Sequence, residues 1–422
     1  MADYFKPRGT ADILPDAALQ WQYVEEMVQK VFATYHYREI RTPIFEHTEV
    51  FERGVGDTTD IVQKEMYTFL DRGDRSITLR PEGTAGVVRA FVEQKLYGGP
   101  LPAKLYYFGP MFRYETPQAG RTRQFHQYGV EVIGSDDPRV DAEVIELADH
   151  FLRAVGVTST TLELNSVGCP VCRVAHKDAL VAHLLPIKDE LCEDCQSRIV
   201  RNPLRILDCK IDAHHPVVES SPMITDHLCD DCAAHFAAVR NYLDLLEVPY
   251  VVNKKLVRGL DYYTKTAFEF VEGSIGAQST ILAGGRYNGL VKSLGGPDVP
   301  GIGFAGGIER LLLALAANGV SHEVPDEVEV YVMALSNEAH AMSVNILRDL
   351  RVVGVVADAD YTGRGLKAQM KTADRLNAKV AVLIGEDEVK SGQLAVRDLS
   401  TREQILVAQG DTVAKILNIL QS

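Results

Sequence analysis

The sequence has no long hydrophobic segment that would place it in a membrane. Among its 422 residues, no apolar run approaches the roughly 20 residues that a membrane-spanning helix needs. Its first residues, MADYFKPRGTADILPD, lack a positively charged segment followed by an apolar one, so we expect no signal peptide. We therefore predict a cytoplasmic protein with no membrane partner.

The sequence also lacks an excess of positive charge, internal repeats and low-complexity segments. Its 44 Lys and Arg residues stand against 58 Asp and Glu residues, which gives a net charge of −14. This balance excludes a protein that coats nucleic acid without specificity, although a local basic face is compatible with it. At roughly 100–200 residues per domain, the length predicts two to four domains of ordinary globular composition.

One segment of low apolar content, NGVSHEVPD at 318–326, divides the sequence into two patterns. After it, strands and helices alternate, which predicts a small α/β domain of parallel strands at 323–422. Before it, at 1–322, we predict a mostly antiparallel α+β body with a helical, cysteine-containing insert at about 165–240. Within this body, the hydrophobic patterns indicate helices at 17–36 and 139–155, a strand–turn–helix unit at 75–92 and a long hairpin at 104–134.

The hairpin predicted at 104–134 carries a group of arginines at its turn. Its first strand ends in FRYE, with Arg113 and Glu115, and the loop that follows contains Arg121 and Arg123. Arginine presents a fixed fork of donors that fits phosphate or carboxylate groups. Taken alone, the pattern also fits a surface hairpin with ordinary salt bridges.

Two other stretches place polar groups where a core strand would bury them. On the second hairpin strand, QFHQYGVEVIG, period-two alternation puts Gln127, Gly129 and Glu131 on one face. The stretch RGLDYY, which begins at Arg258, concentrates hydrogen-bonding groups immediately before the alternating strand TKTAFEF.

Two further motifs have ordinary structural explanations when each is taken alone. RPEGT places Glu82, Gly83 and Thr84 at a strand-to-helix turn, where Thr caps a helix well and Glu suits its N-terminus. GGIERLLLAL fits a core helix, but Arg310 lies beside its apolar face. We expect Arg310 to reach an anion or to stack on a planar ring.

In this order, these stretches together resemble the three motifs of class II aminoacyl-tRNA synthetases. Motif 1 corresponds to the helix at 17–36 and REIRTP with Pro43, motif 2 to FRYE, its loop and QFHQYGVE, and motif 3 to GIGFAGGIER. RPEGT, RGLDYYTKTAFE and AGGRYNGL are similar to histidyl-tRNA synthetases in particular, and the similarity extends over nearly the whole chain.

The resemblance implies a histidine–tRNA ligase with an antiparallel class II catalytic domain and a C-terminal α/β anticodon-binding domain. Such an enzyme activates L-histidine with ATP to histidyl-adenylate and pyrophosphate, then transfers histidine to the 3′ end of its tRNA. The resemblance also implies Mg²⁺ and a homodimer formed through the motif 1 region. The alternatives are a regulatory or tRNA-sensing relative and a prolyl or threonyl synthetase. The complete set of motif arginines, the C-terminal domain and the RGLDYY pocket disfavour them.

Roles follow for the positions that match the family's motifs. Arg258 and Arg113 are expected to be catalytic and to act on the α-phosphate. The expected histidine-binding residues are Glu82, Gly83, Thr84, Arg113, Gln127, Glu131, Arg258, Tyr262 and Tyr263. The expected ATP-binding residues are Arg113, Glu115, Arg121 and Arg310. The expected tRNA-binding residues are Arg121, Arg123, Arg364, Lys367 and Lys371.

The resemblance places Glu131 and Tyr263 at the two ring nitrogens of the substrate histidine. Neutral imidazole has one donor and one acceptor, which a carboxylate and a phenol can satisfy. An analogue that lacks either nitrogen would leave a buried group unpaired, and such sites discriminate by about 10⁴–10⁵.

The C-terminal domain is not basic overall, since residues 324–422 hold 11 Lys and Arg against 14 Asp and Glu. Four basic residues nonetheless recur at spacings of three and four, and we expect them on one helix face opposite Leu366, Met370 and Leu376: Arg364, Lys367, Lys371 and Arg375. A solvated helix face is the alternative. The resemblance favours contact with phosphates or with the anticodon.

Six of the seven cysteines form CxxC pairs, which in a cytoplasmic protein indicates metal rather than disulfides. Cys169 and Cys172, with Cys192 and Cys195, have the spacing of a structural tetrahedral zinc site. The third pair, Cys229 and Cys232, with Cys209, could replace one of these. The alternative is a set of reduced cysteines without a metal. We expect any zinc to be structural, because the reaction does not require it.

Overall fold

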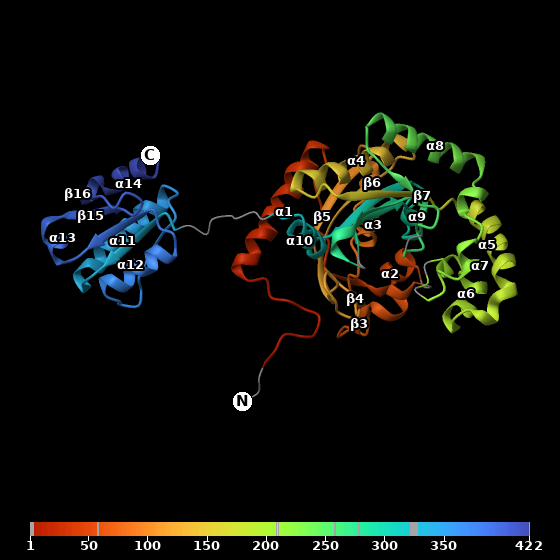
Figure 1. Cartoon of the computed structure of the whole chain (residues 1–422), viewed down its shortest axis with the longest axis horizontal. Coiled ribbons are helices and arrows are strands. Elements are labelled where there is room, and N and C mark those ends of the chain that lie inside the picture. Colours follow the sequence, from red (N-terminus) through yellow and green to blue (C-terminus); the bar gives the residue numbers. More distant parts are fainter. Residues whose placement is uncertain are drawn as a thin grey trace. The chain divides into compact units, whose positions relative to one another are not determined.

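The computed structural model describes residues 4–56, 59–207, 209, 211–256, 259–276, 279–320 and 328–421. The chain divides into two units, Met1–His322 and Glu323–Ser422, each with its own sheet (Figure 1). Within the described ranges, no helix is both long enough and apolar enough to cross a membrane.

The described part of the first unit is built on an eight-stranded sheet with the order β1-β5-β6-β11-β10-β9-β7-β8. The pairings from β5 to β7 are antiparallel, and the outermost pairs at the two edges are parallel. In this order the strands are Arg38–Glu39, Ala103–Phe112, Gln124–Ile133, Gly301–Gly307, Thr280–Arg286, Thr264–Glu272, Thr160–Ser166 and Val251–Val252.

Four helices share the main hydrophobic core with one face of this sheet: α1 (Pro15–Thr34), α4 (Pro138–Val155), α8 (Asp230–Leu245) and α10 (Ile308–Ala317). The sequence sets the bounds of α4. The Asp137 side chain accepts a hydrogen bond from the Arg139 amide, Pro138 takes the first helical position, and Gly156 ends the helix with a φ of 101°.

The opposite face of the sheet carries α3 (Thr84–Glu93) and α9 (Leu290–Ser293), which pack on Ile133 and Tyr287. Next to them lie α2 (Thr48–Val55) and a sheet of three described strands, β2 (Phe45–His47), β4 (Ser76–Leu79) and β3 (Tyr67–Leu70). These elements leave part of the second face of the large sheet accessible, and the pocket described below lies there.

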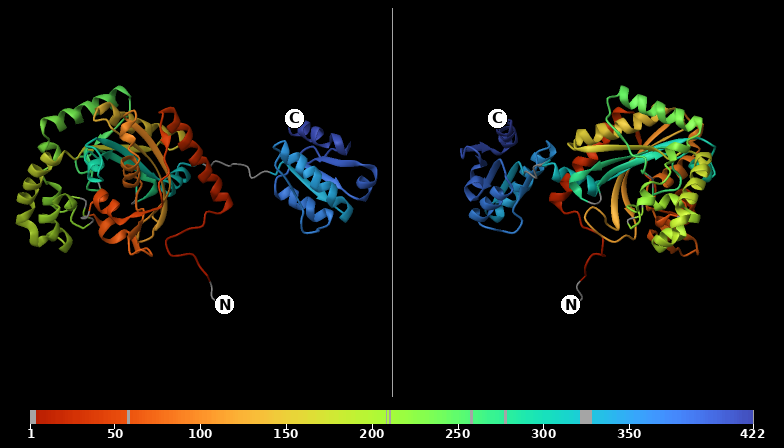
Figure 2. Two further views of the ribbon diagram at one scale, coloured as in Figure 1. Left: turned by 180° about the vertical axis from the view of Figure 1, so that it is seen from behind. Right: turned by 45° about the vertical axis from the view of Figure 1, so that its right-hand side comes forward.

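The cysteine-rich insert is helical, as expected from its sequence. It contains α5 (Pro170–Leu184), α6 (Glu193–Arg201) and α7 (Pro216–Glu219), and α8 leads back to the sheet core. Figure 2 shows the first three of these helices, in yellow-green, as a cluster at one side of the large sheet. Short helical turns connect many elements of both units: Ile61–Glu65, Leu96–Gly98, Leu185–Glu190, Pro203–Ile206, Ile224–His227, Gly273–Ile275 and Gln409–Asp411.

The second unit has a five-stranded sheet in its described residues, with the order β13-β12-β14-β15-β16. The strands, in chain order, are Val330–Ala334, Ala357–Ala359, Val380–Ile384, Gln393–Asp398 and Gln404–Ala408. Helices α11 (Asn337–Val352) and α14 (Thr412–Leu420) cover one face and α12 (Leu366–Arg375) covers the other. A short α13 (Glu386–Ser391) joins β14 to β15.

The expected fold class, an antiparallel catalytic body with a helical insert and an α/β domain, is confirmed. Parallel pairing in the second unit is limited to β12, β13 and β14. β15 and β16 add an antiparallel hairpin, because only a few residues connect them and no crossover helix intervenes.

Candidate active site

The pocket face of the large sheet follows from the alternation along β6. Tyr128, Val130 and Val132 point into the helix-covered core, whereas Gln127 and Glu131 line a pocket on the other face. The alternation predicted from QFHQYGVEVIG is therefore present.

This pocket has a volume of about 310 Å³, within the roughly 300–1,000 Å³ of small-molecule sites. The residues of the sequence prediction that line it come from distant parts of the chain: Glu82, Thr84, Arg113, Glu115, Arg121, Gln127, Glu131, Tyr262, Tyr263 and Arg310. Arg258 lies outside the described residues, so its expected role stays a prediction.

Glu131 lies at the floor of the pocket with both carboxyl oxygens engaged. The hydroxyl of Thr84 donates to Oε1 at 2.6 Å, and the hydroxyl of Tyr287 donates to Oε2 at 2.6 Å. The side chain is almost fully buried. Burial raises the pKa of Glu131 to about 8, although the two hydrogen bonds act in the opposite direction. Near neutral pH this carboxyl therefore carries a proton that it can share.

Glu82, not Thr84, caps the helix that starts at RPEGT. The Glu82 carboxylate accepts hydrogen bonds from the backbone amides of Thr84, at 2.7 Å, and Ala85, at 2.8 Å. Burial raises the pKa of Glu82, while these amides favour the charged form. Glu82 therefore both caps the start of α3 and lines the pocket.

Close packing around Tyr107 explains two glycines that lie near the pocket. A Cβ at Gly83 or at Gly129 would overlap the ring of Tyr107, which is itself buried. Gly83 therefore admits this ring beside the pocket. It is not among the residues that line the pocket.

The two tyrosines of RGLDYY lie side by side at the pocket. Their ring centroids are 4.7 Å apart, and the ring of Tyr262 also contacts that of Tyr287, with the centroids at 5.9 Å. Burial raises the pKa of the Tyr262 hydroxyl well above its ordinary value, so it stays a donor at neutral pH. The hydroxyl-rich wall thus faces the same space as Glu131.

Three guanidinium groups converge at another part of the pocket. Arg113 donates to the carbonyl of Pro81 at 2.8 Å and lies over the ring of Phe125. Arg310 donates to the carbonyls of Gly120, at 3.2 Å, and Thr280, at 2.8 Å.

In addition to burial, mutual repulsion of these groups contributes to lowering the pKa of Arg310 and of Arg121. Burial lowers the pKa of Arg310, and the charges of Arg121 and Arg113 lower it further. Arg121 forms an ion pair with the buried carboxylate of Glu115. A bound anion would relieve this concentration of positive charge.

Sequence reasoning missed several lining residues. Tyr287 belongs to AGGRYNGL, a stretch that the resemblance singled out without assigning roles, and it is the direct partner of Glu131. Glu269, Phe125 and Glu309 also line the pocket. The alternation of side chains along the strand TKTAFEF could have predicted that Glu269 lies on one face of the sheet, apart from its apolar neighbours Phe268 and Phe270.

Arg123 is the motif 2 residue that does not line the pocket. Its guanidinium lies 3.8 Å from the ring centroid of Tyr114 and donates to the carbonyl of Glu115 at 3.2 Å. Arg121, by contrast, lines the pocket. Of the two loop arginines expected to contact tRNA, one therefore lies in the pocket and the other packs against Tyr114.

In the second unit, the expected basic face is only partly on a helix. α12 begins at Leu366, so Arg364 precedes it, and its side chain pairs with Asp360. Lys367 and Lys371 are exposed on α12. The expected apolar face is wrong at Leu366, which is 42% exposed, because the buried positions of the helix are Gln369 and Ala373.

The cysteines do not gather as the spacing suggested. Cys169 and Cys172 lie with Cys229 and Cys232, whereas Cys192 and Cys195 lie with Cys209 and Asp212. A single site made of Cys169, Cys172, Cys192 and Cys195 is therefore wrong. Distance along the chain does not decide which pairs meet, since the start of α8 returns to the start of α5 and the pair at Cys192 lies in the chain between them.

Comparison with known proteins gives the family. The profile described as Histidyl-tRNA synthetase matches residues 9–180 and 207–311, and the profile described as Anticodon binding domain matches 329–419. A histidine–tRNA ligase of Halothermothrix orenii is 51% identical over 99% of this chain and 100% of its own length. The ligase of Moorella thermoacetica is 55% identical over 96% of each chain.

Solved structures agree with these sequences. The crystal structure of apo S. aureus histidyl-tRNA synthetase has a TM-score of 0.83 and 42% identity, over 98% of this chain and all of that chain. A Bacillus halodurans structure titled as an ATP phosphoribosyltransferase regulatory subunit/histidyl-tRNA synthetase has a TM-score of 0.62 at 21% identity, over 90% of this chain and 98% of that one, and shows the fold alone. On these matches, this chain belongs to the histidyl-tRNA synthetase family.

Proposed function

We propose that the pocket is where this ATP-dependent histidine–tRNA ligase forms histidyl-adenylate. One observation supports the assignment above others. A buried carboxyl, held in place by the hydroxyls of Thr84 and Tyr287, lies in the same pocket as three converging guanidinium groups. The first suits an imidazole and the second suits the phosphates of ATP.

Glu131 recognises the histidine ring in this proposal. Imidazole has an ordinary pKa of about 6.5, so a carboxyl with a pKa of about 8 can share one proton with it at neutral pH. Tyr287 and Thr84 hold the carboxyl in place, and Tyr263 approaches the other ring nitrogen. A substrate without a ring nitrogen would leave the proton of the buried carboxyl without an acceptor, which costs more than a lost contact in water.

The α-amino group of histidine then lies toward Glu82, Thr84 and Gln127, which line the adjoining wall. The two backbone hydrogen bonds to Glu82 favour its charged form, which suits an ammonium, against the effect of burial.

The reaction is an in-line displacement at the α-phosphorus of ATP. A carboxylate oxygen of histidine forms the new P–O bond, and the bond to pyrophosphate breaks, so no proton is transferred and no enzyme nucleophile is needed. Arg113, Arg121 and Arg310 orient the phosphates and stabilise the charge on their oxygens. Arg258 is proposed to act with Arg113 on the α-phosphate.

Magnesium fits the same part of the pocket. Glu115, Glu269 and Glu309 supply carboxylate oxygens there, which are the ligands that this cation prefers. When bound, Mg²⁺ neutralises part of the charge of the ATP phosphates. The residues of this chain hold the nucleotide and exclude water.

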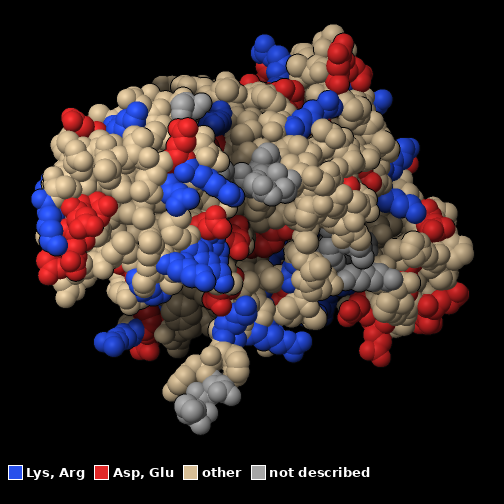
Figure 3. All heavy atoms as spheres, turned by 60° about the vertical axis from the view of Figure 1, so that its left-hand side comes forward, with Lys and Arg blue, Asp and Glu red and all other residues tan. Residues whose placement is uncertain are grey.

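Transfer RNA is proposed to contact both units. In the second unit, Lys367 and Lys371 are exposed on α12, and Asp360 orients Arg364 beside its start. In the first unit, Arg121 and Arg123 belong to the loop between β5 and β6. On the face of the molecule in Figure 3, basic side chains lie among acidic ones, so these contacts must be local.

A homodimer through the motif 1 region is proposed from exposed apolar groups. Ile44 and Phe45 are 44% and 54% exposed, and Phe69 and Leu70 of the adjoining three-stranded sheet are 49% and 65% exposed. Sedimentation would give a dimer mass for the native enzyme. Substitution of Phe45 and Leu70 by Ser would shift it toward the monomer, and an unchanged dimer would exclude this surface.

A structural zinc in the insert is also proposed, without a part in catalysis. None of the described residues that line the pocket is a cysteine. The groups that could hold the metal lie in and beside the insert helices.

The proposed pocket chemistry is tested by ATP–pyrophosphate exchange, run with Mg²⁺ and each amino acid separately. We expect the wild type to show exchange with histidine alone, and Arg113→Ala to lose this exchange. The melting temperature of Arg113→Ala should change no more than that of the control Arg139→Ala, a substitution at an exposed position. Normal exchange by Arg113→Ala would contradict the proposed site.

A further inference from the structure

Three of the four residue pairs of the cysteine region share one local geometry. Cys169, Cys192 and Cys229 are the residues immediately before α5, α6 and α8, and each partner cysteine lies in the first turn of its helix. Amide groups at a helix start favour thiolates. The fourth pair, Cys209 and Asp212, has the same spacing with a carboxylate in place of the second thiol.

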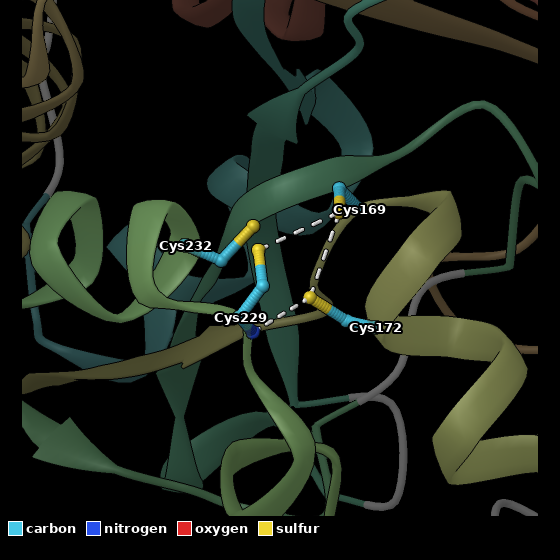
Figure 4. Close-up of side chains that lie close together, drawn as sticks. All are labelled: Cys169, Cys172, Cys229 and Cys232. Atoms are coloured by element: carbon cyan, nitrogen blue, oxygen red, sulfur yellow. Dashed lines mark hydrogen bonds between the residues drawn. The ribbon is translucent and has the colours of Figure 1, made fainter.

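At the base of the insert, four thiols face one another (Figure 4). The Cys169 sulfur lies 3.5 Å from that of Cys172 and 3.9 Å from that of Cys229, and all four sulfurs, including that of Cys232, lie within 4.8 Å of one another. The Cys229 amide donates to the Cys172 sulfur at 3.2 Å. We call these four residues the base cluster.

Farther along the insert, a second group has three thiols and one carboxylate. The Cys192 sulfur lies 3.9 Å from that of Cys209, and the ligand atoms of Cys192, Cys195, Cys209 and Asp212 lie within 4.8 Å of one another. Asp212 is 6% exposed, and the Cys192 amide donates to its carboxylate. We call these four residues the outer cluster.

We propose that the insert holds two structural zinc ions, one in each cluster. Four thiolates at a Zn–S distance of about 2.3 Å around a tetrahedral ion lie roughly 3.8 Å apart, close to the spacings of both clusters. Each thiol releases its proton when it binds the metal, and no oxidant is involved. All seven cysteines of the chain are used, with Asp212 as the eighth ligand.

The base cluster also holds the segment that carries the pocket tyrosines. The Lys265 amide donates to the carbonyl of Gly168, next to Cys169, at 2.9 Å. Its ammonium lies 3.2 Å from a carboxylate oxygen of Asp231, between Cys229 and Cys232. A chain neighbour of each half of the base cluster therefore contacts Lys265, two residues after Tyr263.

A second contact fixes the other end of the same segment. Arg173 follows Cys172 in α5, and its guanidinium donates to the carbonyls of Val167, at 3.3 Å, and Asp261, at 3.4 Å. Tyr262 and Tyr263 thus lie between two points that the base cluster positions. Its cysteines act as positioning residues for the histidine pocket, an extension that rests on the proposed function.

Among the residues that the structure describes, the outer cluster has no such connection to the pocket segment. Its cysteines pack with insert residues such as Leu184, Ile199 and Val218, and none of its four members lines the pocket. It stabilises the outer part of the insert, and it provides a matched control for the base cluster.

Metal content tests the two sites independently of the enzyme's function. Full-length enzyme, loaded with Zn²⁺ under reducing conditions and dialysed against a competing chelator, is expected to retain two zinc ions per chain. Cys229→Ser with Cys232→Ser removes one, Cys192→Ser with Cys209→Ser removes the other, and Asp194→Asn, an exposed carboxylate of α6, removes neither. Retention of one ion or none by the wild type, or disulfides in place of free thiols, overturns the proposal.

Kinetics test the positioning role. Loss of the base cluster is expected to raise the KM for histidine about tenfold or more, with a KM for ATP changed less than about twofold. Loss of the outer cluster lowers the melting temperature and leaves both KM values near those of the wild type. Equal effects of the two losses on histidine KM would overturn the positioning role while leaving the zinc sites intact.

A third variant covers the case in which the base-cluster variant does not fold. Arg173→Ala keeps all eight ligands and is expected to retain two zinc ions while raising the KM for histidine. Unchanged histidine KM in Arg173→Ala would contradict the positioning role. Failure of the proposed pocket chemistry itself would appear separately, as loss of histidine-specific exchange in the wild type.

Discussion

Tyr287 reaches the pocket carboxyl because Gly301 has no side chain. A Cβ at Gly301 would overlap the ring of Tyr287, whose hydroxyl donates to Glu131 at 2.6 Å. The two residues lie on neighbouring parts of the sheet, where the Tyr287 amide also donates to the carbonyl of Gly301. A glycine of motif 3 thereby sets the position of a hydroxyl at the proposed histidine site.

Gly301→Ala tests this relationship. The displaced Tyr287 ring would weaken its hydrogen bond to Glu131, so we expect a KM for histidine about tenfold higher and a lower melting temperature. Gly273→Ala is the control, because a Cβ there would meet no atom within 4 Å. Wild-type kinetics for Gly301→Ala would show that the position of Tyr287 does not matter to the substrate.

The raised pKa of Glu131 predicts a pH dependence of stability. Its pKa in the folded protein is about 8, against an ordinary 4.5, so the folded state holds a proton that the unfolded state has lost. The stabilising contribution is fully present below about pH 4.5 and is lost as the pH rises toward about 8.

Melting curves of the ligand-free enzyme and of Glu131→Gln measure this contribution. Between about pH 5 and pH 8 the wild type should lose stability relative to the variant, and above about pH 8 the difference should level off. The exposed substitution Glu193→Gln should show no such trend. A constant difference across this range would mean that burial does not raise the pKa of Glu131.

Arg310→Lys tests the phosphate end of the pocket. Lysine has no planar fork, and its single nitrogen does not reproduce the two separated donors, Nε and Nη1, that bind the carbonyls of Gly120 and Thr280. We expect the KM for ATP to rise about 10–100-fold with little change for histidine. Arg139→Lys, an exposed position on α4, is the control. An equal rise in both KM values would indicate a general disturbance of the pocket.

Lys367→Ala combined with Lys371→Ala tests the second unit. Loss of two exposed charges should raise the KM for tRNA about tenfold and flatten its dependence on salt concentration. ATP–pyrophosphate exchange does not involve tRNA and should be unchanged. The control is Lys390→Ala on α13, whose ammonium pairs with Glu386. An unaltered salt dependence would place the tRNA contacts elsewhere.

Local patterns predicted individual elements well. The alternation of QFHQYGVEVIG identified the faces of β6, and RPEGT identified the start of α3 at Thr84, because both depend on neighbouring residues alone. The hairpin of β5 and β6 followed from two apolar-rich strands flanking one loop.

Such local patterns could not predict which distant segments of the chain contact each other. Tyr287 meets Glu131 across 156 positions of the chain, and its partner is determined by the strand order of the sheet. The grouping of Cys172 with Cys229 likewise depends on the return of α8 to the start of α5. The spacing of Arg364 and Lys367 suggested one helix face, but α12 begins only at Leu366.

The most direct measurement is ATP–pyrophosphate exchange by Glu131→Gln at saturating ATP, with histidine varied. If Glu131 recognises the imidazole ring, kcat/KM for histidine should fall about 10³-fold or more, while the KM for ATP and the folded structure are retained. Exchange close to that of the wild type would contradict the assignment of this pocket to the histidine ring.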